Sequence, residues 1–413
     1  MVTQLNTQER ARLRVLHVAR NFPDPVLPRL GLWTERLVRA TLGRCAPEVI
    51  APVPYWPPIP GPADYTRFRR VPAETVRDGV RVHHPRFLAG PGSSLKQFEG
   101  LPFYAAVKPV ADRLHAEQRF DLIHGHFIYP DGWAAARLAK RYGVPLIVTE
   151  HASWRPWLDH APRIRKHAVE AASQSRFMVA VSRSLASSIA EFVEIGERLR
   201  VIPNVVDESV FTLPRADNVQ VANRLIFVGL IRHVKGLDLL LTALRSLLDR
   251  GQELSLTVVG ESFYGAYRAD HDAALEQVTA LGLAPHVSFL GGMPPAEVAQ
   301  EIWKSRLLVL PSRRETFAAV LVEALACGRP VVATRCGGPE DIVNDNVGVL
   351  VDPENPEALA DGIAAVLDRR YDPALLREHA VARFGTRVVG EQLVRLYDEA
   401  LTSPAARLPR TGK

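Results

Sequence analysis

The stretch that decides the fold reads Leu307-Leu-Val-Leu-Pro-Ser-Arg-Arg-Glu315-Thr-Phe-Ala-Ala-Val-Leu-Val-Glu323-Ala-Leu-Ala-Cys-Gly-Arg-Pro-Val-Val-Ala333. The apolar run at 307–310 predicts a buried strand, residues 317–327 predict a helix, and 331–333 predict a second strand. Strands joined through a helix in this way lie parallel in one sheet.

The same alternation of short apolar runs and amphipathic stretches fills both halves of the chain. Strands are expected in the first half at 14–19, 48–52, 80–83, 122–124, 146–149, 177–181 and 200–202. In the second half they are expected at 224–228, 255–259, 287–290, 307–310, 331–333 and 348–351. Continuous apolar strands indicate parallel sheets covered by helices on both faces. The predicted fold class is α/β, with two Rossmann-like doubly wound domains facing across a cleft.

A polar, proline-containing segment separates the two series of strands. It runs from Ile202-Pro-Asn-Val-Val-Asp207 through Pro214 to Asn218 and predicts an interdomain linker. We therefore expect a first domain at 1–204, a linker at 205–218 and a second domain at 219–385. The stretch 386–413 is expected to hold a C-terminal helix, which could cross back to the first domain, and a tail.

Composition excludes several classes of protein. The 413 residues are 47% hydrophobic and 23% charged, which is typical of a soluble globular chain. No apolar stretch is long enough to span a bilayer, and the polar N-terminus does not resemble a signal peptide. Three cysteines provide neither a disulfide framework nor metal-ligand spacing, so reduced thiols in a cytoplasmic protein are expected.

Charge is distributed unevenly along the chain. Residues 1–200 contain 29 Lys and Arg against 18 Asp and Glu, whereas the remainder is slightly acidic. No motif of a nucleic-acid-binding module accompanies this surplus, so nucleic acid is not an expected partner. The basic half suggests an anionic partner instead: a phosphate-bearing acceptor, or the anionic inner face of a membrane contacted peripherally.

Two glutamates in the deciding stretch are candidates for sugar and nucleotide binding. Glu315 falls in the loop before a helix whose N-terminus offers free N–H groups to phosphate or sugar oxygens. Glu323 lies two turns further on, among apolar residues where a bare carboxylate is costly. Paired ribose hydroxyls would suit its two oxygens, and a buried ion pair with an arginine is the alternative.

A second candidate segment follows the first strand of the second half. Neither GxGxxG after the first strand nor GxxxxGK[ST] occurs, which disfavours dinucleotide oxidoreductases and P-loop enzymes. The segment Gly229-Leu-Ile-Arg232-His-Val-Lys235-Gly236 occurs instead. Two cations at such a turn could neutralise a diphosphate leaving group.

These motifs together resemble the retaining GT-B glycosyltransferases of family 4, glycosyl transferases group 1, of the bacterial polysaccharide-biosynthesis type. The resemblance rests on Glu315 and Glu323 at their spacing, on Gly337-Gly-Pro-Glu340, and on the loop from Gly229 to Gly236. Phe289-Leu-Gly291-Gly is similar to the family's loop near the nucleobase. The resemblance covers roughly residues 12–400.

The resemblance implies a role for each matching position in the second half. Glu315 would contact the transferred sugar, and the amides of Thr316, Phe317 and Ala318 would help to hold it. Glu323 would bind ribose, and Lys235 would hold the diphosphate. The family's arginine usually follows the first glycine directly; here Leu230 occupies that position, and Arg232 would act from a shifted one.

The first half would supply the acceptor side. Gly31 matches the family's N-terminal glycine loop, where the backbone approaches the donor phosphate, so it is a donor-binding candidate. His151 lies where the family has an active-site histidine, able to bind the donor sugar or orient the acceptor hydroxyl. Further acceptor-side candidates are His126, Trp154, Arg155, Tyr55 and Trp56, the last two within a proline-rich loop at 52–60.

The expected reaction is metal-independent transfer of a hexose-type unit from a UDP- or GDP-linked sugar to a hydroxyl of a glycan, lipid-linked or small acceptor. No cofactor is expected. His124-Gly-His126 near Asp131 could suggest a metal site, but His126 is expected to order a loop. Two alternatives remain open: a nucleotide-sugar epimerase of the same fold and a non-catalytic GT-B subunit.

Overall fold

The computed structural model describes residues 12–55, 66–90, 95–152, 161–215, 223–260 and 268–402. It divides into two compact units. Unit 1 comprises Met1–Val179, Ala190–Arg200 and Gly390–Lys413, and unit 2 comprises Ala180–Ile189 and Val201–Val389. Residues 180–189 thus belong with the second unit, and the chain from 390 onward belongs with the first.

Within its described residues, unit 1 is built on an eight-stranded sheet in the order β10-β9-β8-β7-β1-β2-β5-β4. Strands β8, β7, β1, β2 and β5 pair in parallel, and β4 is antiparallel to β5. The strands are β1 (Leu13–Val18), β2 (Cys45–Ile50), β4 (Glu74–Arg77), β5 (Val80–His83), β7 (Leu122–His126), β8 (Leu146–Glu150), β9 (Phe177–Ala180) and β10 (Leu199–Val201).

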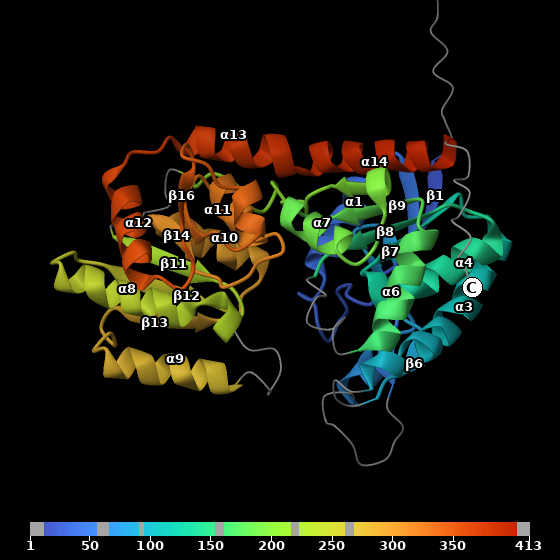
Figure 1. Ribbon diagram of the computed structural model, residues 1–413, viewed down its shortest axis with the longest axis horizontal. Helices are drawn as coiled ribbons and strands as arrows, with labels where there is room; N and C mark the ends of the chain where they lie inside the picture. The colour runs from blue at the N-terminus through green and yellow to red at the C-terminus, as the bar shows by residue number, and fades with distance from the viewer. Residues whose placement is uncertain are drawn as a thin grey trace, which may run out of the picture. The chain divides into compact units, whose positions relative to one another are not determined.

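Helices pack on this sheet because its central strands are apolar on both faces. In β1, for example, Val15, Leu16 and Val18 are all fully buried. Figure 1 shows the helices around the sheet. They are α1 (Leu32–Ala40), η1 (Arg67–Arg70), η2 (Lys96–Phe98), α3 (Gly100–Glu117), the π-type turn η3 (Ile128–Gly132), α4 (Trp133–Tyr142), α6 (Pro162–Gln174), η4 (Gly196–Arg198) and α14 (Thr386–Thr402). No helix in the described part of the chain is long and apolar enough to cross a bilayer.

The loop expected at 52–60 begins as a strand. Residues Val53–Tyr55 form β3, which pairs in parallel with β6 (Arg86–Leu88) and sets Tyr55 opposite Leu88. Proline is tolerated in this two-stranded pair because an edge strand leaves backbone positions that need no N–H donor. Trp56 lies outside the described residues, as does the rest of the loop.

The described part of unit 2 contains a six-stranded sheet in the order β13-β12-β11-β14-β15-β16, and every neighbouring pair is parallel. Its strands are β11 (Arg224–Val228), β12 (Ser255–Val259), β13 (Val287–Gly291), β14 (Leu307–Leu310), β15 (Val331–Thr334) and β16 (Gly348–Val351). Counted within the unit, this is the order 3-2-1-4-5-6 of the Rossmann fold. The order reverses between β11 and β14, and ligands of such sheets bind at the carboxyl ends of the strands beside this point.

Helices cover both faces of the second sheet (Figure 1). They are η5 (His233–Lys235), α8 (Leu237–Asp249), α9 (Arg268–Ala280), α10 (Pro295–Lys304), α11 (Ala319–Ala326), η7 (Gly338–Asp341), α12 (Pro356–Asp368) and α13 (Pro373–Phe384). Residues 183–189 of α7 (Arg183–Ala190) also belong to unit 2.

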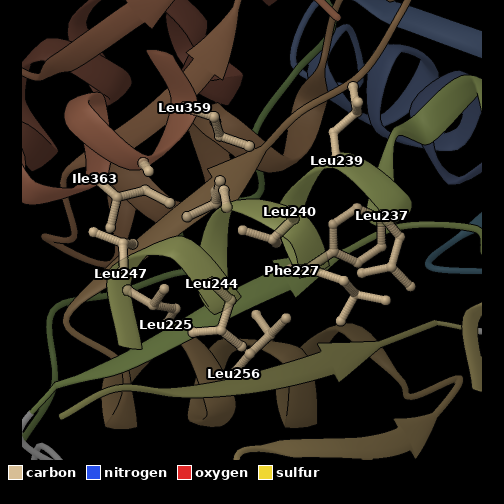
Figure 2. Close-up of a cluster of buried hydrophobic side chains, with 14 of the residues drawn as sticks. Leu225, Phe227, Leu237, Leu239, Leu240, Leu244, Leu247, Leu256, Leu359 and Ile363 are labelled. Carbon is tan, nitrogen blue, oxygen red and sulfur yellow. The ribbon is translucent and has the colours of Figure 1, made fainter. Parts of the chain in front are cut away.

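One apolar cluster fixes α8 on the sheet of unit 2. Figure 2 shows Leu240 and Leu244 of α8 with Phe227 of β11 and Ile363 of α12, all fully buried. Burying a side chain of this size contributes about 1.5–3 kcal/mol. The cluster therefore holds the start of α8, and the turn η5 before it, in place beside the carboxyl end of β11.

Candidate active site

Lys235, Ser312 and Glu315 meet at the point where the strand order of unit 2 reverses; we name them the Lys235 cluster. Lys235 Nζ lies 2.6 Å from Glu315 Oε1, and Ser312 Oγ donates to the same oxygen at 2.7 Å. Lys235 follows β11 and the other two residues follow β14. The side chain of Lys235 is 25% exposed and that of Glu315 is 8% exposed. The cluster thus places an ammonium group, partly open to solvent, at the ligand-binding edge of the sheet.

Arg313 ties the two loops of the cluster together. Its backbone N–H donates to Val234 O at 2.8 Å, and its guanidinium donates to His233 O at 2.6 Å. The guanidinium also forms a two-pronged pair with Asp238 at 2.8 and 2.7 Å and an ion pair with Glu354 at 2.6 Å. These carboxylates raise the pKa of Arg313 above its ordinary value. A bidentate pair fixes direction as well as distance, so Arg313 is a scaffold for Lys235.

Gly236 allows the same two loops to approach closely. Its φ of +70° is in the left-handed region, and a Cβ added there would lie 2.0 Å from Pro311 O. No other residue fits without moving the backbone. The glycine therefore brings the loop after β11 against the loop after β14.

The loop after β15 also bonds the residues of the Lys235 cluster. Glu315 N donates to Cys336 O at 3.0 Å, and Gly338 N donates to Glu315 O at 3.1 Å. The Thr334 hydroxyl donates to Ser312 O. The backbone of Glu315 is thus held on both sides, which leaves its carboxylate oriented toward Lys235.

The helix after Glu315 starts two residues later than the sequence predicts. Helix α11 begins at Ala319, because Ala318 adopts the left-handed conformation with φ 69° and ψ 55°. Phe317 is buried and packs edge-on against Phe384 at 5.7 Å between ring centroids. Thr316 is half-buried in the loop. The predicted sugar-binding amides therefore belong to a loop anchored by Phe317 rather than to a first helical turn.

Glu323 lies in the middle of α11 and is half-buried, although its neighbours Val322 and Ala324 are buried. The structure therefore leaves part of this residue accessible in an otherwise apolar helix.

The remaining residues of unit 2 that are predicted to bind the sugar donor lie at strand ends of the same sheet. Gly229 directly follows β11 and donates its N–H to Val259 O at 3.0 Å. Arg232 is half-buried and directly precedes η5. Its backbone carbonyl accepts a hydrogen bond from Lys235 N at 2.8 Å. Gly291 ends β13 with φ +72°. All three lie at the carboxyl edge to which the Lys235 cluster belongs.

In unit 1, Gly31 has a clear structural function. It precedes α1 with φ +80°, and a Cβ there would lie 2.1 Å from Asn21 O. The loop after β1 could not fold back on itself with a side chain at this position.

Glu150 positions His151 at the carboxyl end of β8. This fully buried carboxylate accepts N–H donors from Ile128, His151 and Ala152, each at 2.8 Å. His151 itself is nearly buried and contacts the ring of Phe127 at 5.1 Å. Three convergent backbone donors satisfy a buried carboxylate, so Glu150 fixes the loop that carries His151.

Asp131 connects the carboxyl ends of β1 and β7, where the strand order of unit 1 reverses. It accepts a hydrogen bond from Arg20 N, and burial raises the pKa of its carboxyl to about 8. The Arg20 guanidinium pairs with Glu99 at 2.5 Å. The sequence analysis names Asp131 only as a neighbour of His124 and His126, and it does not predict the contact with Arg20, because this contact spans distant parts of the chain.

His126 is fully buried at the end of β7, within hydrogen-bonding distance of His151 Nε2 at 3.3 Å. It therefore contacts the predicted active-site histidine rather than solvent. Trp154 and Arg155 lie outside the described residues. Sequence reasoning missed Ser312, Arg313, Asp238 and Glu150. The available signals were the positions of Ser312 and Arg313 directly after one strand and of Glu150 at the carboxyl end of another.

Two family models match the chain. Glycosyl transferases group 1 matches residues 215–383, and glycosyltransferase family 4 matches residues 60–210. D-inositol 3-phosphate glycosyltransferase 1 of Catenulispora acidiphila is 30% identical over 385 residues, covering 86% of this chain and 86% of that protein. D-inositol 3-phosphate glycosyltransferase of Frankia alni is 31% identical over 359 residues, covering 79% and 86%.

Solved structures share the fold. Anabaena HepE, crystallised with UDP and glucose, has a TM-score of 0.70 at 20% identity and covers 94% of this chain and 100% of that chain. Sucrose-phosphate synthase of Thermosynechococcus elongatus has a TM-score of 0.75 at 19% identity, covering 94% and 99%. The two Rossmann-like units are those of the GT-B glycosyltransferases, and the chain belongs to glycosyltransferase family 4.

Proposed function

We propose that this glycosyltransferase moves a hexose-type sugar from a UDP- or GDP-linked donor to an acceptor hydroxyl, with retention of configuration at the anomeric carbon. The observation that supports this proposal is the Lys235 cluster. It joins a cation and a carboxylate at the carboxyl edge of a Rossmann-type sheet, beside the reversal of strand order. Nucleotide ligands of such sheets bind at this point.

Each residue of unit 2 has a distinct part in the proposal. Lys235, aided by Arg232, holds the diphosphate, and Glu315 accepts hydrogen bonds from hydroxyls of the sugar. Glu323 accepts from the ribose hydroxyls through its accessible side. Lys235 and Glu315 are already paired at 2.6 Å, so the cation is held in place before the donor arrives. A preorganised cation costs no reorganisation when charge develops on the leaving group.

The reaction requires no protein nucleophile. The bond between the anomeric carbon and the diphosphate oxygen breaks, and Lys235 stabilises the charge that this oxygen gains. The acceptor oxygen attacks from the same face, and its proton passes to the departing phosphate oxygen. Bonds and charges balance, and the configuration of the sugar is kept.

We propose that transfer needs no metal, because Lys235 and Arg232 supply the positive charge that a divalent cation would supply elsewhere. Activity should persist in EDTA after extensive dialysis. Loss of turnover in EDTA, restored by Mg²⁺ or Mn²⁺, would contradict this part of the proposal.

The acceptor we propose is anionic. Residues 1–200 carry the basic surplus, and the relatives cited above are named for an acceptor that bears a phosphate. Transfer to D-inositol 3-phosphate and to free inositol should be compared first, followed by lipid-linked acceptors of polysaccharide or glycolipid synthesis. Sedimentation with anionic vesicles at low salt tests a peripheral site of action on the inner face of a cytoplasmic membrane.

The donor is tested by a thermal-shift screen of UDP- and GDP-sugars, followed by turnover. Glu323→Ala should weaken binding of the matching nucleoside diphosphate. Asp249→Ala is a matched control in the same unit: it also removes a carboxylate, but Asp249 ends α8, at the opposite end of that helix from Lys235, and pairs with Arg245 at 2.6 Å. Unchanged affinity in Glu323→Ala would refute the ribose assignment. Release of an altered nucleotide sugar without any acceptor would indicate the epimerase instead.

A further inference from the structure

Four large apolar side chains are exposed within one short stretch of unit 1. Leu88, Leu95, Phe98 and Leu101 are 60%, 42%, 49% and 65% exposed, and we name them the apolar row. Leu88 ends β6, Phe98 ends η2, and Leu101 lies in the first turn of α3. Exposed apolar side chains that are scattered singly need no explanation, whereas neighbouring ones mark an interaction site. Their mutual position therefore decides what they mean.

The members of the apolar row adjoin one another. Leu95, Phe98 and Leu101 are spaced by three residues, and Phe98 N donates to Leu95 O at 3.0 Å in a helical turn. Side chains at this spacing lie on one side of such a turn. Leu95 also packs over Gly90, where an added Cβ would lie 2.6 Å from Leu95 Cδ1. Because Gly90 is two residues beyond Leu88, this contact extends the row toward β6.

The interior of unit 1 holds the apolar row in place. Phe87 of β6 and Phe103 of α3 are buried edge-on against each other, with ring centroids 5.3 Å apart. The hydroxyl of Tyr129 accepts from Gly100 N at 2.8 Å and donates to Lys96 O at 3.1 Å. The row is thus a preformed feature of the folded unit, which presents it to solvent at no further cost in chain ordering.

One group of cations lies beside the apolar row on α6. Arg163, at the start of this helix, lies over the ring of Phe98 with its Cζ 4.7 Å from the ring centroid. Arg165 and Lys166 follow on the same helix, and both are exposed. The contact between Arg163 and Phe98 therefore brings the basic start of α6 against the row.

A second group of cations lies on η1. Arg86, two residues before Leu88 on β6, donates to Phe68 O at 2.7 Å and so holds η1 against this strand. Arg69 and Arg70 of η1 are exposed. Positive charge therefore lies near both ends of the apolar row.

Acidic residues are scarce in these segments. Residues 86–103 contain one, Glu99, which is 3% exposed and pairs with Arg20 at 2.5 Å. Residues 66–73 contain none, and the one acidic residue of α6 is Glu170, two turns beyond Arg163. The exposed charge around the apolar row is consequently positive.

We infer that the apolar row and the cations of η1 and α6 form a docking surface for an anionic lipid bilayer. Leucine and phenylalanine side chains enter the boundary between headgroups and acyl chains, and arginine and lysine pair with lipid phosphates. A second copy of this chain is a poorer occupant, because a symmetric contact through the row would bring the same cations together.

The docking surface is joined to the carboxyl edge of the sheet in unit 1. Tyr129, which bonds the start of α3, follows β7 directly, and β7 ends at His126. The consequence for transfer rests on the proposed function. A lipid-linked acceptor reaches this edge while its lipid stays in the bilayer, so docking raises the local concentration of acceptor.

Sedimentation of the full chain with vesicles tests the docking surface. We expect binding to phosphatidylglycerol that weakens as salt is raised, because salt screens exposed charges, and little binding to phosphatidylcholine. Hydrogen exchange of the amides at 95–101 should slow when phosphatidylglycerol vesicles are added. Binding to neither lipid, equal binding to both, or slowed exchange confined to other segments would overturn the inference.

Variants at exposed positions leave the fold intact and separate the apolar from the ionic contribution. Leu101→Gln should weaken vesicle binding about tenfold, because one leucine is no longer transferred out of water. Leu375→Gln is the matched control, since Leu375 is 62% exposed in the first turn of α13 in unit 2. Equal binding by these two variants would overturn the inference.

The ionic contribution has its own pair of variants. Arg165→Gln should weaken binding about fivefold, the contribution of one cation near an anionic surface. Arg395→Gln removes an exposed arginine from α14, which lies at the other end of unit 1 from β6 (Figure 1), and should leave binding unchanged. An equal effect of the two substitutions would reduce the surface to a matter of net charge and overturn the inference.

The outcomes separate the docking surface from the proposed transfer. Vesicle binding needs no sugar donor, so it decides the inference even if the chain transfers no sugar. Conversely, a chain that transfers sugar to a soluble acceptor but binds no vesicle refutes the docking surface alone. Self-association that Leu101→Gln abolishes, without vesicle binding, would assign the apolar row to a second copy and overturn the inference.

Discussion

Replacing Lys235 with methionine tests the proposed donor site most sharply. The substitution keeps most of the side-chain length and removes the ammonium group. In the free protein, the Ser312 hydroxyl, which donates at 2.7 Å, is then the remaining hydrogen-bond partner of Glu315 Oε1 among the described residues. Two quantities should change: the stability of unit 2, and its affinity for a nucleoside diphosphate.

The affinity change is expected to be the larger. A hydrogen bond to a charged group contributes about 1.5–3 kcal/mol, so losing Lys235 should weaken binding about 10- to 150-fold. The stability change should be smaller, about 1–2 kcal/mol, because Lys235 is 25% exposed and solvent screens the pair.

Isothermal titration with UDP and GDP measures the affinity, and urea unfolding measures the stability. Lys304→Met is a matched control, because Lys304 pairs with Glu301 at 2.7 Å in the same unit but is 46% exposed. Its unfolding free energy should change by less than about 0.5 kcal/mol, and its nucleotide affinity should not change. Binding by Lys235→Met within twofold of wild type would refute the proposed diphosphate contact.

Three further predictions concern stability. Ala318→Gly should raise the unfolding free energy by about 0.5 kcal/mol, because relief of left-handed strain outweighs the added chain entropy; Ala319→Gly, inside the helix, should lower it by about 0.5–1 kcal/mol. Burial raises the pKa of Asp131 to about 8, so native stability is lost as pH rises toward 8. The unfolding free energy of Asp131→Asn, measured in urea, should increase relative to that of wild type by about 1 kcal/mol per pH unit between pH 6.5 and 8. His17 has its pKa lowered to about 3, so stability is lost as pH falls from 6 to 4; His17→Phe should reduce that slope by about 1.4 kcal/mol per pH unit, and an equal slope would contradict the assignment.

Much of the fold could be predicted from the sequence because hydrophobic patterns are local. The apolar runs that become β11, β14 and β15 are separated by helical patterns, and this alternation specifies a parallel sheet. Lys235 and Glu315 were also predictable as candidates, since each follows such a strand. Their contact, across 80 residues, follows from the strand order.

The remaining features depend on contacts that no local pattern encodes. Tyr397 bonds His124 across 273 residues, and the part of the C-terminal helix that carries Tyr397, from Gly390 onward, belongs with unit 1. The left-handed conformation of Ala318 contradicts the preference of alanine, and the residue before it, Phe317, packs against Phe384. The strand at Tyr55 exists only because β6 pairs with it, and its prolines would otherwise predict a loop.

The most direct test of the central claim combines donor binding with the stereochemistry of the product. The full chain should be titrated with UDP- and GDP-sugars, and the product of the best donor should be examined by proton NMR at the anomeric centre. The account predicts one nucleoside diphosphate sugar bound per chain and a product that keeps the donor's anomeric configuration. A chain that binds no such sugar, or a product of inverted configuration, would contradict it.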